Sequence, residues 1–418
     1  MNLSPRRRWL LFTLALTAGV LNLVDRQIIS VLKPTIAADL GWSDDDYGTL
    51  AAWFQAGAAF GFLAAGWLVD RLGAKWANAA GVAAWSLAAM THGWASSFSQ
   101  FVLCRIGLGA TESMGTPAGV KTIATIFPPN LRSLGFGLTN MMNSIGAILA
   151  PLAIPLVAAV WGWRAAFVLA GVVGLLWVLA WLAASRGVDF DDRQPALPGN
   201  LVSGDKLFLK EGRTWTIALA KVLSDATWWL MLFWMPDYFH RQFGLSGTDL
   251  GPPLALAYCG SAAGSLLSGY AANRLLAKGW TANRTRKTLM LISALCVVPV
   301  PLALYAHEYW AAVGLMALTL AGHQGFSTNL FGLIADVTPR HKVGRVTGFG
   351  AFCGNLGGTA ISKIAGLVLA AGLGYGPLFA FASFSYLLAL GWIQLTMPQI
   401  LLVEESIVPA EPLTSPSA

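Results

Sequence analysis

Four ionisable side chains lie in apolar stretches of this sequence. Asp25 and Arg26 are adjacent near the end of an apolar run that begins at Trp9, and Arg105 and Glu112 lie seven residues apart in a later run. Seven residues make two turns of an α-helix, so Arg105 and Glu112 share one helix face, about 10 Å apart along its axis. The planar guanidinium group of arginine binds both oxygens of a carboxylate at once. We therefore expect a binding site for an organic anion that includes Arg26 and Arg105.

The composition is that of an integral membrane protein. The chain has 418 residues, of which 56% are hydrophobic, 11% are charged and 18 are tryptophan. Soluble proteins carry about 25% charged residues, and Trp collects at lipid–water boundaries. An ionisable group within a bilayer costs ~2.5–3.5 kcal/mol and usually marks function. The net charge of +7 does not indicate nucleic-acid binding, because the Lys and Arg residues fall in short loops.

Apolar stretches of about 20 residues can cross the ~30 Å hydrocarbon core of a bilayer, and the sequence contains twelve of them. They must be helices, since an open sheet leaves backbone groups unsatisfied in lipid. The predicted fold is therefore an all-α membrane protein with twelve transmembrane helices in two six-helix halves. The predicted spans are residues 9–32, 47–69, 76–95, 98–125, 134–160, 163–185, 215–240, 250–276, 287–307, 309–335, 346–371 and 376–399.

We divide the chain into an N-terminal half (1–185), a cytoplasmic linker (186–214), a C-terminal half (215–400) and a disordered cytoplasmic tail (401–418). The linker is polar, charged and rich in Pro and Gly, and the tail ends in PAEPLTSPSA. The first residues have a basic start but no small-residue cleavage site, so we interpret them as a retained first span rather than a signal peptide.

The distribution of positive charge predicts the orientation. Twenty of the 27 Lys and Arg residues fall in segments on one side of the predicted spans, three fall on the other side, and four lie within spans. Because cytoplasmic loops carry the excess of Lys and Arg, we expect both termini to be cytoplasmic, in a multi-pass protein of the inner membrane. An even number of spans agrees with this orientation.

The two halves repeat each other weakly. The segment GWLVDRLGAK (66–75) corresponds to GYAANRLLAK (269–278), and NSIGAILAP (143–151) lines up with NLGGTAISK (355–363), about 212 residues later. A tandem repeat of six helices is typical of transporters that bind their substrate near the middle of the membrane, between the halves.

Several segments resemble one transporter family. The motif formed by Gly66, Asp70, Arg71, Gly73 and Lys75 resembles the loop between helices two and three of the major facilitator superfamily. The segments NLVDRQIISVLKPTIAADLGWSDDDYG, RIGLGATES, SDATWWLMLFWMPDYF and HQGFSTNLFGLIADVTPR, among others, resemble the hexuronate-transporter branch of its anion:cation symporters. The resemblance covers nearly the whole chain except the linker and tail. It implies uptake of a sugar-acid anion with a proton, or in some relatives sodium, by alternating access.

The resemblance also implies roles for individual residues. Arg26 and Arg105 match the anion-binding arginines of the family, and Asp25 and Glu112 match its proton-carrying carboxylates. The alternative is an ion-paired network that only orients the helices. Asp70, Arg71 and Lys75 are expected to form a latch between the halves on the cytoplasmic side.

Further polar and aromatic residues in the spans could bind the substrate. Aromatic rings stack on the apolar face of a sugar ring, and amides bind its hydroxyl groups. Each could equally pack or pair within the protein, and Lys221 and Asp225, four residues apart, could simply neutralise each other. The candidates are Asn22, Gln55, Asn143, Trp228, Trp229, Tyr238, His323, Gln324, Asn329 and Lys363.

Other functions remain as alternatives. Relatives commonly carry tyrosines where this chain has Leu23 and Ala58, so the substrate could instead be an aromatic or dicarboxylic acid. A channel or a transport-inactive sensor is a further possibility. The sequence has no HExxH, Walker-type or nucleophile-elbow motif that would indicate an enzyme, and its four cysteines have no ligand spacing. We expect no cofactor, no bound metal and no nucleic-acid partner. The expected partners are a carboxylate substrate, protons and the lipid bilayer, and the chain is expected to be a monomer.

Overall fold

The computed structural model describes residues 4–127, 129–188, 190, 209–338 and 340–400, and these contain helices but no strands. The first half consists of α1 (Pro5–Val31), α2 (Lys33–Leu40), α3 (Asp44–Thr91), α4 (Phe98–Glu112), α5 (Gly115–Ile126), α6 (Pro129–Trp161) and α7 (Trp163–Ala184). The second half consists of α8 (Gly212–Phe243), η2 (Gly247–Leu250), α9 (Gly251–Ala277), α10 (Ala282–Val297), η3 (Val300–Tyr305), α11 (Tyr309–Val337), α12 (Arg340–Ala370) and α13 (Gly376–Thr396).

The twelve predicted spans are found, although some helix boundaries differ. Eight helices in the described part of the chain are long and apolar enough by themselves to cross a bilayer. One of them, α3, has 48 residues, which is about 72 Å at 1.5 Å per residue and therefore more than two bilayer cores. Gly73 divides it into two spans, because its φ of 75° lies in the left-handed region that interrupts a helix.

The span formed by α4 and α5 is bent rather than continuous. Pro117 has no backbone N–H to donate to the carbonyl group of Ser113, which removes one helical hydrogen bond at this point. Two turn residues, Ser113 and Met114, separate α4 from α5 as a result. The bend lies directly after Glu112, one of the ionisable residues singled out above.

The short helix α2 was not predicted as a separate element. It has Pro34 in its first turn and ends at Gly41, whose left-handed conformation terminates the helix. The next helix, α3, begins with a capping box between Ser43 and Asp46. These signals turn the chain sharply between the first two spans and leave α2 at one end of the bundle.

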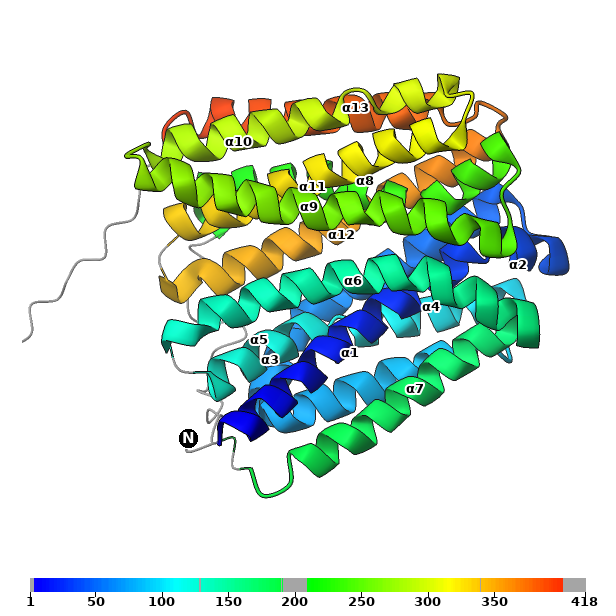
Figure 1. The fold of residues 1–418 in the computed structure, drawn as a ribbon, viewed down its shortest axis with the longest axis horizontal. Helices are drawn as coiled ribbons and strands as arrows, with labels where there is room; N and C mark the ends of the chain where they lie inside the picture. The colour runs from blue at the N-terminus through cyan, green and yellow to red at the C-terminus, as the bar shows by residue number, and fades with distance from the viewer. Residues whose placement is uncertain (1–3, 128, 189, 191–208, 339, 401–418) are drawn as a thin grey trace, which may run out of the picture.

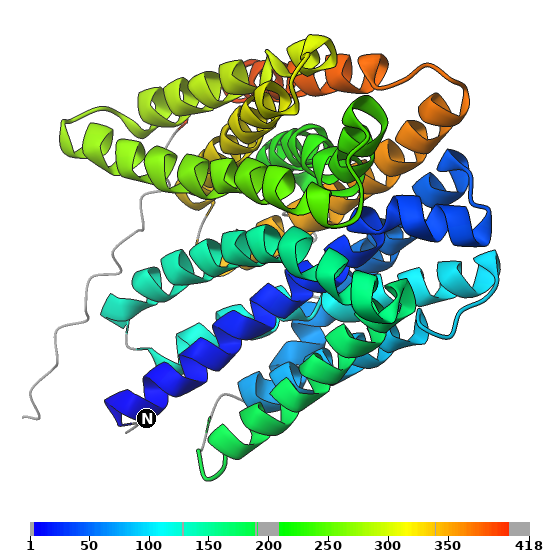
Figure 2. The same cartoon turned by 45° about the vertical axis from the view of Figure 1, so that its right-hand side comes forward.

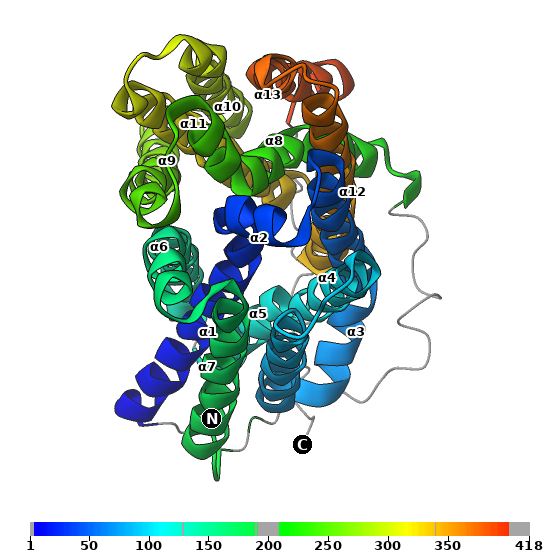
Figure 3. The ribbon, with the colours of Figure 1, turned by 90° about the vertical axis from the view of Figure 1, so that its right-hand side faces the viewer.

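The two halves lie side by side, with α1–α7 below and α8–α13 above in Figures 1 and 2. We call the end where α1 begins the terminal end, and the opposite end, where α2 lies, the distal end. Figure 3 views the molecule from the distal end, with α2 between the halves. Contacts between the halves run mainly through three helix pairs: α3 with α12, α6 with α9, and α1 with α8.

The predicted linker and tail lie largely outside the described residues. Residue 189 and residues 191–208 of the linker, and all of 401–418, belong to this part of the chain. The helix α8 begins at Gly212, slightly before the boundary expected at residue 215. The division into domains therefore stays a prediction.

Candidate functional site

The ionisable residues of the first and fourth spans meet inside the N-terminal half. Arg26 on α1 donates from Nε to Glu112 Oε2 on α4 at 2.6 Å. The Glu112 side chain is fully buried, and that of Arg26 is 15% exposed. Asp25 is buried and interacts electrostatically with Arg26 and Glu112, and its carboxylate makes no hydrogen bond within the described residues. These residues are thus shielded from lipid, as expected for a functional cluster.

Arg105 is completely buried, yet it has no hydrogen-bond partner in the part of the chain that the structure describes. Its three guanidinium nitrogens are all unpaired among the described residues, and so is Oε1 of Glu112. The sequence spacing placed Arg105 and Glu112 on one helix face, and in the structure Glu112 bonds to Arg26. An uncompensated buried charge costs several kcal/mol. The arrangement therefore suits an anion that brings its own oxygen atoms to Arg105.

Aromatic rings from both halves contact the two arginines. The Arg105 Cζ atom lies 4.2 Å from the centre of the Phe54 ring on α3 and 6.0 Å from that of Phe233 on α8. Arg26 Cζ lies 5.7 Å from the Phe54 ring and 5.6 Å from the ring of Trp229 on α8. Such contacts stabilise a cation by about 0.5–2 kcal/mol. Because Phe233 and Trp229 come from the C-terminal half, the charged cluster lies where the halves meet.

The polar candidates of the first half, Gln55, Asn22 and Asn143, lie on three different helices. Gln55 on α3 is completely buried. Neither polar atom of its amide, nor Nδ2 of Asn22 on α1, has a hydrogen-bond partner among the residues that the structure describes. Asn143 lies on α6, but its side chain is outside the described part of the structure. Gln55 and Asn22 thus keep free polar groups within the bundle, as a polar ligand or buried water would require.

The aromatic and amide candidates of the second half divide into two groups. Trp228 stacks on His323 with ring centres 4.8 Å apart, and His323 Nδ1 lies 2.6 Å from the hydroxyl oxygen of Tyr386. Tyr238 instead donates to the carbonyl oxygen of Ala303 and packs among aromatic rings near the distal end.

Two further candidates of the second half lie on α11. Asn329 donates to Ser268 on α9 at 2.7 Å, and Gln324 is half-buried. Tyr238 and Asn329 therefore have the packing and helix-pairing contacts that were the alternatives to substrate binding. Lys221 and Asp225 on α8 do neutralise each other, with Nζ and Oδ2 2.7 Å apart.

Lys363 is not a free cation beside the arginines. It forms an ion pair with Asp45 and donates to Thr49 Oγ1 at 2.9 Å. Gly48 and Gly366 pack together beside this pair, and a Cβ atom on Gly48 would lie 2.8 Å from Gly366 Cα. Lys363 on α12 thus joins the C-terminal half to α3 at the distal end.

A group of charges, with Lys33 and Asp237 buried and Arg241 exposed, joins the halves at the same end. Lys33 Nζ lies 2.8 Å from Asp44 Oδ1 and 2.6 Å from Asp237 Oδ1, which belongs to the other half. Arg241 pairs with Asp237 at 2.7 Å and with Asp44, and Tyr375 donates to Asp237 Oδ2 at 2.5 Å. We call these five residues the distal cluster. It was missed in the sequence because Lys33 and Asp237 are 204 residues apart.

A separate pair ties α2 to α7 at the distal end. Asp39 Oδ2 accepts hydrogen bonds from Trp163 Nε1 and Arg164 Nη1, each at 3.0 Å. These two hydrogen bonds, that from Trp163 first, hold the pKa of the Asp39 carboxyl group below its usual value. This contact fixes α2 on its own half.

The loop motif at the terminal end has contacts within its own half. Asp70 pairs with Lys121 at 3.0 Å, the Arg71 guanidinium lies over the Trp67 ring, and Lys75 lies over a neighbouring tryptophan ring. Gly66 and Gly73 belong to the same helix, α3. Among the described residues, Asp70, Arg71 and Lys75 make no ion pair with the C-terminal half, and the latch stays a prediction.

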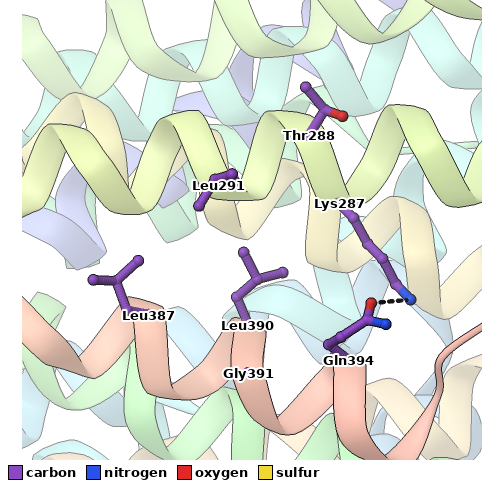
Figure 4. Close-up of a pocket in the computed structure, with 7 residues that line it drawn as sticks. All are labelled: Lys287, Thr288, Leu291, Leu387, Leu390, Gly391 and Gln394. Atoms are coloured by element: carbon purple, nitrogen blue, oxygen red, sulfur yellow. Dashed lines mark hydrogen bonds between the residues drawn. The ribbon is translucent and has the colours of Figure 1, made fainter.

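A shallow groove between α10 and α13 lies apart from these clusters (Figure 4). Its polar group, the Lys287 ammonium, already donates to Gln394 Oε1, Met397 O and Pro398 O. The other lining residues are largely apolar, with three leucines. The groove therefore lacks the free charged groups that distinguish the surroundings of Arg105.

Comparison with known proteins gives consistent matches. The profile of the Major Facilitator Superfamily matches residues 15–362. The D-galactonate transporter of Escherichia coli O6:H1 (strain CFT073) is 25% identical over 92% of this chain and 96% of its own length. The hexuronate transporter of Escherichia coli (strain K12) is 26% identical over 89% and 90%. The D-xylose–proton symporter has the same fold, with a TM-score of 0.72 at 16% identity over 94% of this chain and 99% of that one.

Proposed function

The chain belongs to the major facilitator superfamily and is a membrane transporter, and we propose that it imports a sugar-acid anion together with protons by alternating access. The relatives named for D-galactonate and hexuronates support a sugar acid as the substrate. Both kinds of compound combine one carboxylate with several hydroxyl groups. A site for such a compound needs a cation for the carboxylate and polar groups for the hydroxyl groups.

The observation that carries the proposal is the unpaired guanidinium of Arg105. It is fully buried, contacts the Phe54 ring and has three nitrogens without a hydrogen-bond partner within the described ranges. A substrate carboxylate would supply two acceptors in the geometry that a guanidinium group prefers. Charge-assisted hydrogen bonds of this kind are about twice as strong as neutral ones, which is sufficient reason for the chain to keep a costly buried cation.

The pair formed by Arg26 and Glu112 offers a route for coupling to protons. An anion bound at Arg105 lies close enough to compete with Glu112 for Arg26, since both arginines contact the Phe54 ring. A buried carboxylate that loses its cation is favoured in the protonated form, because burial penalises the charge. Substrate binding thus promotes proton uptake by Glu112, and Asp25 is a second acceptor in the same cluster.

Proton uptake also removes an electrical obstacle. Importing a bare anion against an inside-negative potential costs about 2.3 kcal/mol per charge for every 100 mV. One accompanying proton cancels this cost, and a second makes the potential a driving force. Either number is compatible with the presence of both Asp25 and Glu112.

We assign the terminal end to the cytoplasm on the distribution of Lys and Arg, with the protein in the inner membrane. The distal cluster and the pair of Lys363 with Asp45 then close the outer side. Alternating access requires these contacts between the halves to separate when the carrier opens outward, while the motif at residues 66–75 comes closer to the C-terminal half.

A different carboxylate is the second candidate. Three aromatic rings, those of Phe54, Trp229 and Phe233, surround the two arginines. Leu23 and Ala58 supply no hydroxyl group. A flat aromatic acid could stack among these rings, so it belongs in every ligand test.

The function is tested with purified protein in liposomes that carry an inward proton gradient. We expect D-galactonate or a hexuronate to accumulate above its external concentration, and a protonophore to abolish the accumulation. A panel of aromatic and dicarboxylic acids is measured in parallel. Accumulation of one of those acids alone would replace the sugar-acid assignment, and accumulation that persists without a proton gradient would overturn proton coupling.

A further inference from the structure

Tyr258 on α9 is unusual among the buried tyrosines. Its ring is completely buried, and its hydroxyl group has no hydrogen-bond partner among the described residues. The hydroxyl groups of the other four buried tyrosines all donate hydrogen bonds: Tyr47, Tyr238, Tyr375 and Tyr386. Leaving a buried hydroxyl group unpaired costs about 1–3 kcal/mol. The chain therefore tolerates at Tyr258 a penalty that it avoids at the other four buried tyrosines.

The surroundings of Tyr258 place it near the proposed anion site. Its ring meets the Trp228 ring edge-on, with centres 6.5 Å apart. Trp228 is followed on α8 by Trp229, whose ring centre lies 5.6 Å from Arg26 Cζ, and by Phe233, whose ring centre lies 6.0 Å from Arg105 Cζ. Tyr258 thus borders the segment of α8 whose rings contact the two arginines of the other half, and both Tyr258 and Arg105 hold polar atoms without a partner among the described residues.

We propose that Tyr258 binds a hydroxyl group of the substrate while Arg105 binds its carboxylate, so that Tyr258 selects polyhydroxylated acids over plain carboxylates. The inference rests on the proposed function and adds a specificity determinant to it. A phenol can donate one hydrogen bond and accept others, which suits a substrate hydroxyl group that does both.

The proposed selectivity acts against substrates that lack the matching hydroxyl group. A substrate that lacks the matching hydroxyl group leaves the Tyr258 oxygen buried and unpaired, so discrimination arises from the unmade hydrogen bond. Because Tyr258 and Arg105 belong to different halves, a ligand that reaches both also connects them. A plain carboxylate would bind only the arginine side.

The test compares binding of D-galactonate and its single-deoxy analogues to the wild type and to Tyr258→Phe, by calorimetry in detergent. We expect the substitution to raise the Kd for D-galactonate by about 3–12-fold, the equivalent of one neutral hydrogen bond. For one deoxy analogue, wild type and variant should bind equally. Tyr270→Phe is the matched control, since Tyr270 lies on the same helix but is exposed, and it should bind like the wild type.

Several other results would contradict the inference. Equal D-galactonate affinity in wild type and Tyr258→Phe overturns it, and so does a loss of the same size for every deoxy analogue, which would show a structural effect. The variant should melt at or above the wild-type temperature, because it removes an unpaired polar atom. A clear destabilisation would show that the hydroxyl group has a partner within the protein. A wild type that binds no sugar acid fails the proposed function itself, which the liposome assay detects separately.

Discussion

Arg26 and Glu112 form a buried ion pair at 2.6 Å between the first and fourth spans, while Arg105, two turns before Glu112 on the same helix, has no hydrogen-bond partner among the described residues. Glu112 thus bonds to Arg26 and leaves the Arg105 guanidinium available to a substrate carboxylate, while Asp25 is a second buried acid beside Arg26. In the proposed mechanism, this arrangement links the occupancy of the site to the state of Glu112.

Replacing Glu112 by Gln should separate substrate movement from proton movement. The amide keeps the shape of the side chain but cannot carry a proton. We expect concentrative uptake to be lost while exchange of labelled for unlabelled substrate continues, as measured in liposomes. Glu308→Gln at the exposed start of α11 is the control. Unchanged accumulation in Glu112→Gln would remove this residue from the coupling mechanism.

Replacing Arg105 by Gln should abolish binding but stabilise the empty protein. Losing a charge-paired group costs about 2–5 kcal/mol of binding, which is roughly 30-fold to several thousandfold in Kd. The empty protein loses an uncompensated buried charge, so its melting temperature should rise. Arg105→Lys keeps the charge without the fork and should bind weakly. Thermal melting with and without D-galactonate measures both effects, and a lower melting temperature for empty Arg105→Gln would show that Arg105 has a structural partner.

Replacing Asp237 by Asn should loosen the distal end. The substitution weakens the hydrogen bonds from Lys33 and Arg241, which as bonds to a charged group contribute about 1.5–3 kcal/mol each. Spin labels at positions 94 and 307, one on each half, report the distance between the halves by double electron–electron resonance. The variant should show a larger population of long distances than the wild type. The four native cysteines are replaced beforehand.

The control for this experiment is Asp249→Asn, an exposed residue of the same end. It should leave the distance distribution unchanged. A distribution in Asp237→Asn that matches the wild type would mean that the distal cluster does not hold the halves together.

Stability should depend on pH through Asp39. Its folded-state pKa is lowered by hydrogen bonds from Trp163 and Arg164, so its contribution is fully present above the unfolded value of about 3.9 and is lost as the pH falls through the folded pKa. Asp39→Asn should melt below the wild type at pH 7, and the difference should narrow below about pH 4. A difference in melting temperature that stays constant over this range would contradict the assignment.

Much of the fold follows from local sequence signals. Apolar stretches of bilayer length located the spans, and Pro, Gly and capping residues such as Ser43 set the helix ends. The charges at Asp25, Arg26, Arg105 and Glu112 stood out because lipid excludes them. The helix face shared by Arg105 and Glu112 could be predicted from their spacing of seven residues.

Partners across the two halves could not be predicted in the same way. Lys33 was not singled out in the sequence and Lys363 was considered for the ligand, yet each pairs with an acid on another segment. No sequence pattern indicated Tyr258, because its notable feature is a hydroxyl group without a hydrogen-bond partner among the described residues. Such features depend on how helices are arranged in space, which helix periodicity does not determine.

The distal cluster contains one opposite-charge pair within each half, Lys33 with Asp44 and Arg241 with Asp237. When the halves part, these two pairs can stay intact, so each newly wetted surface is locally neutral rather than bearing a bare ion. Opening then breaks only the bonds between the halves and keeps the pairs within each half. The free-energy difference between the closed and open forms is therefore small. Under the proposed alternating access, a carrier built this way can keep its distal end closed and still open it at a rate compatible with turnover.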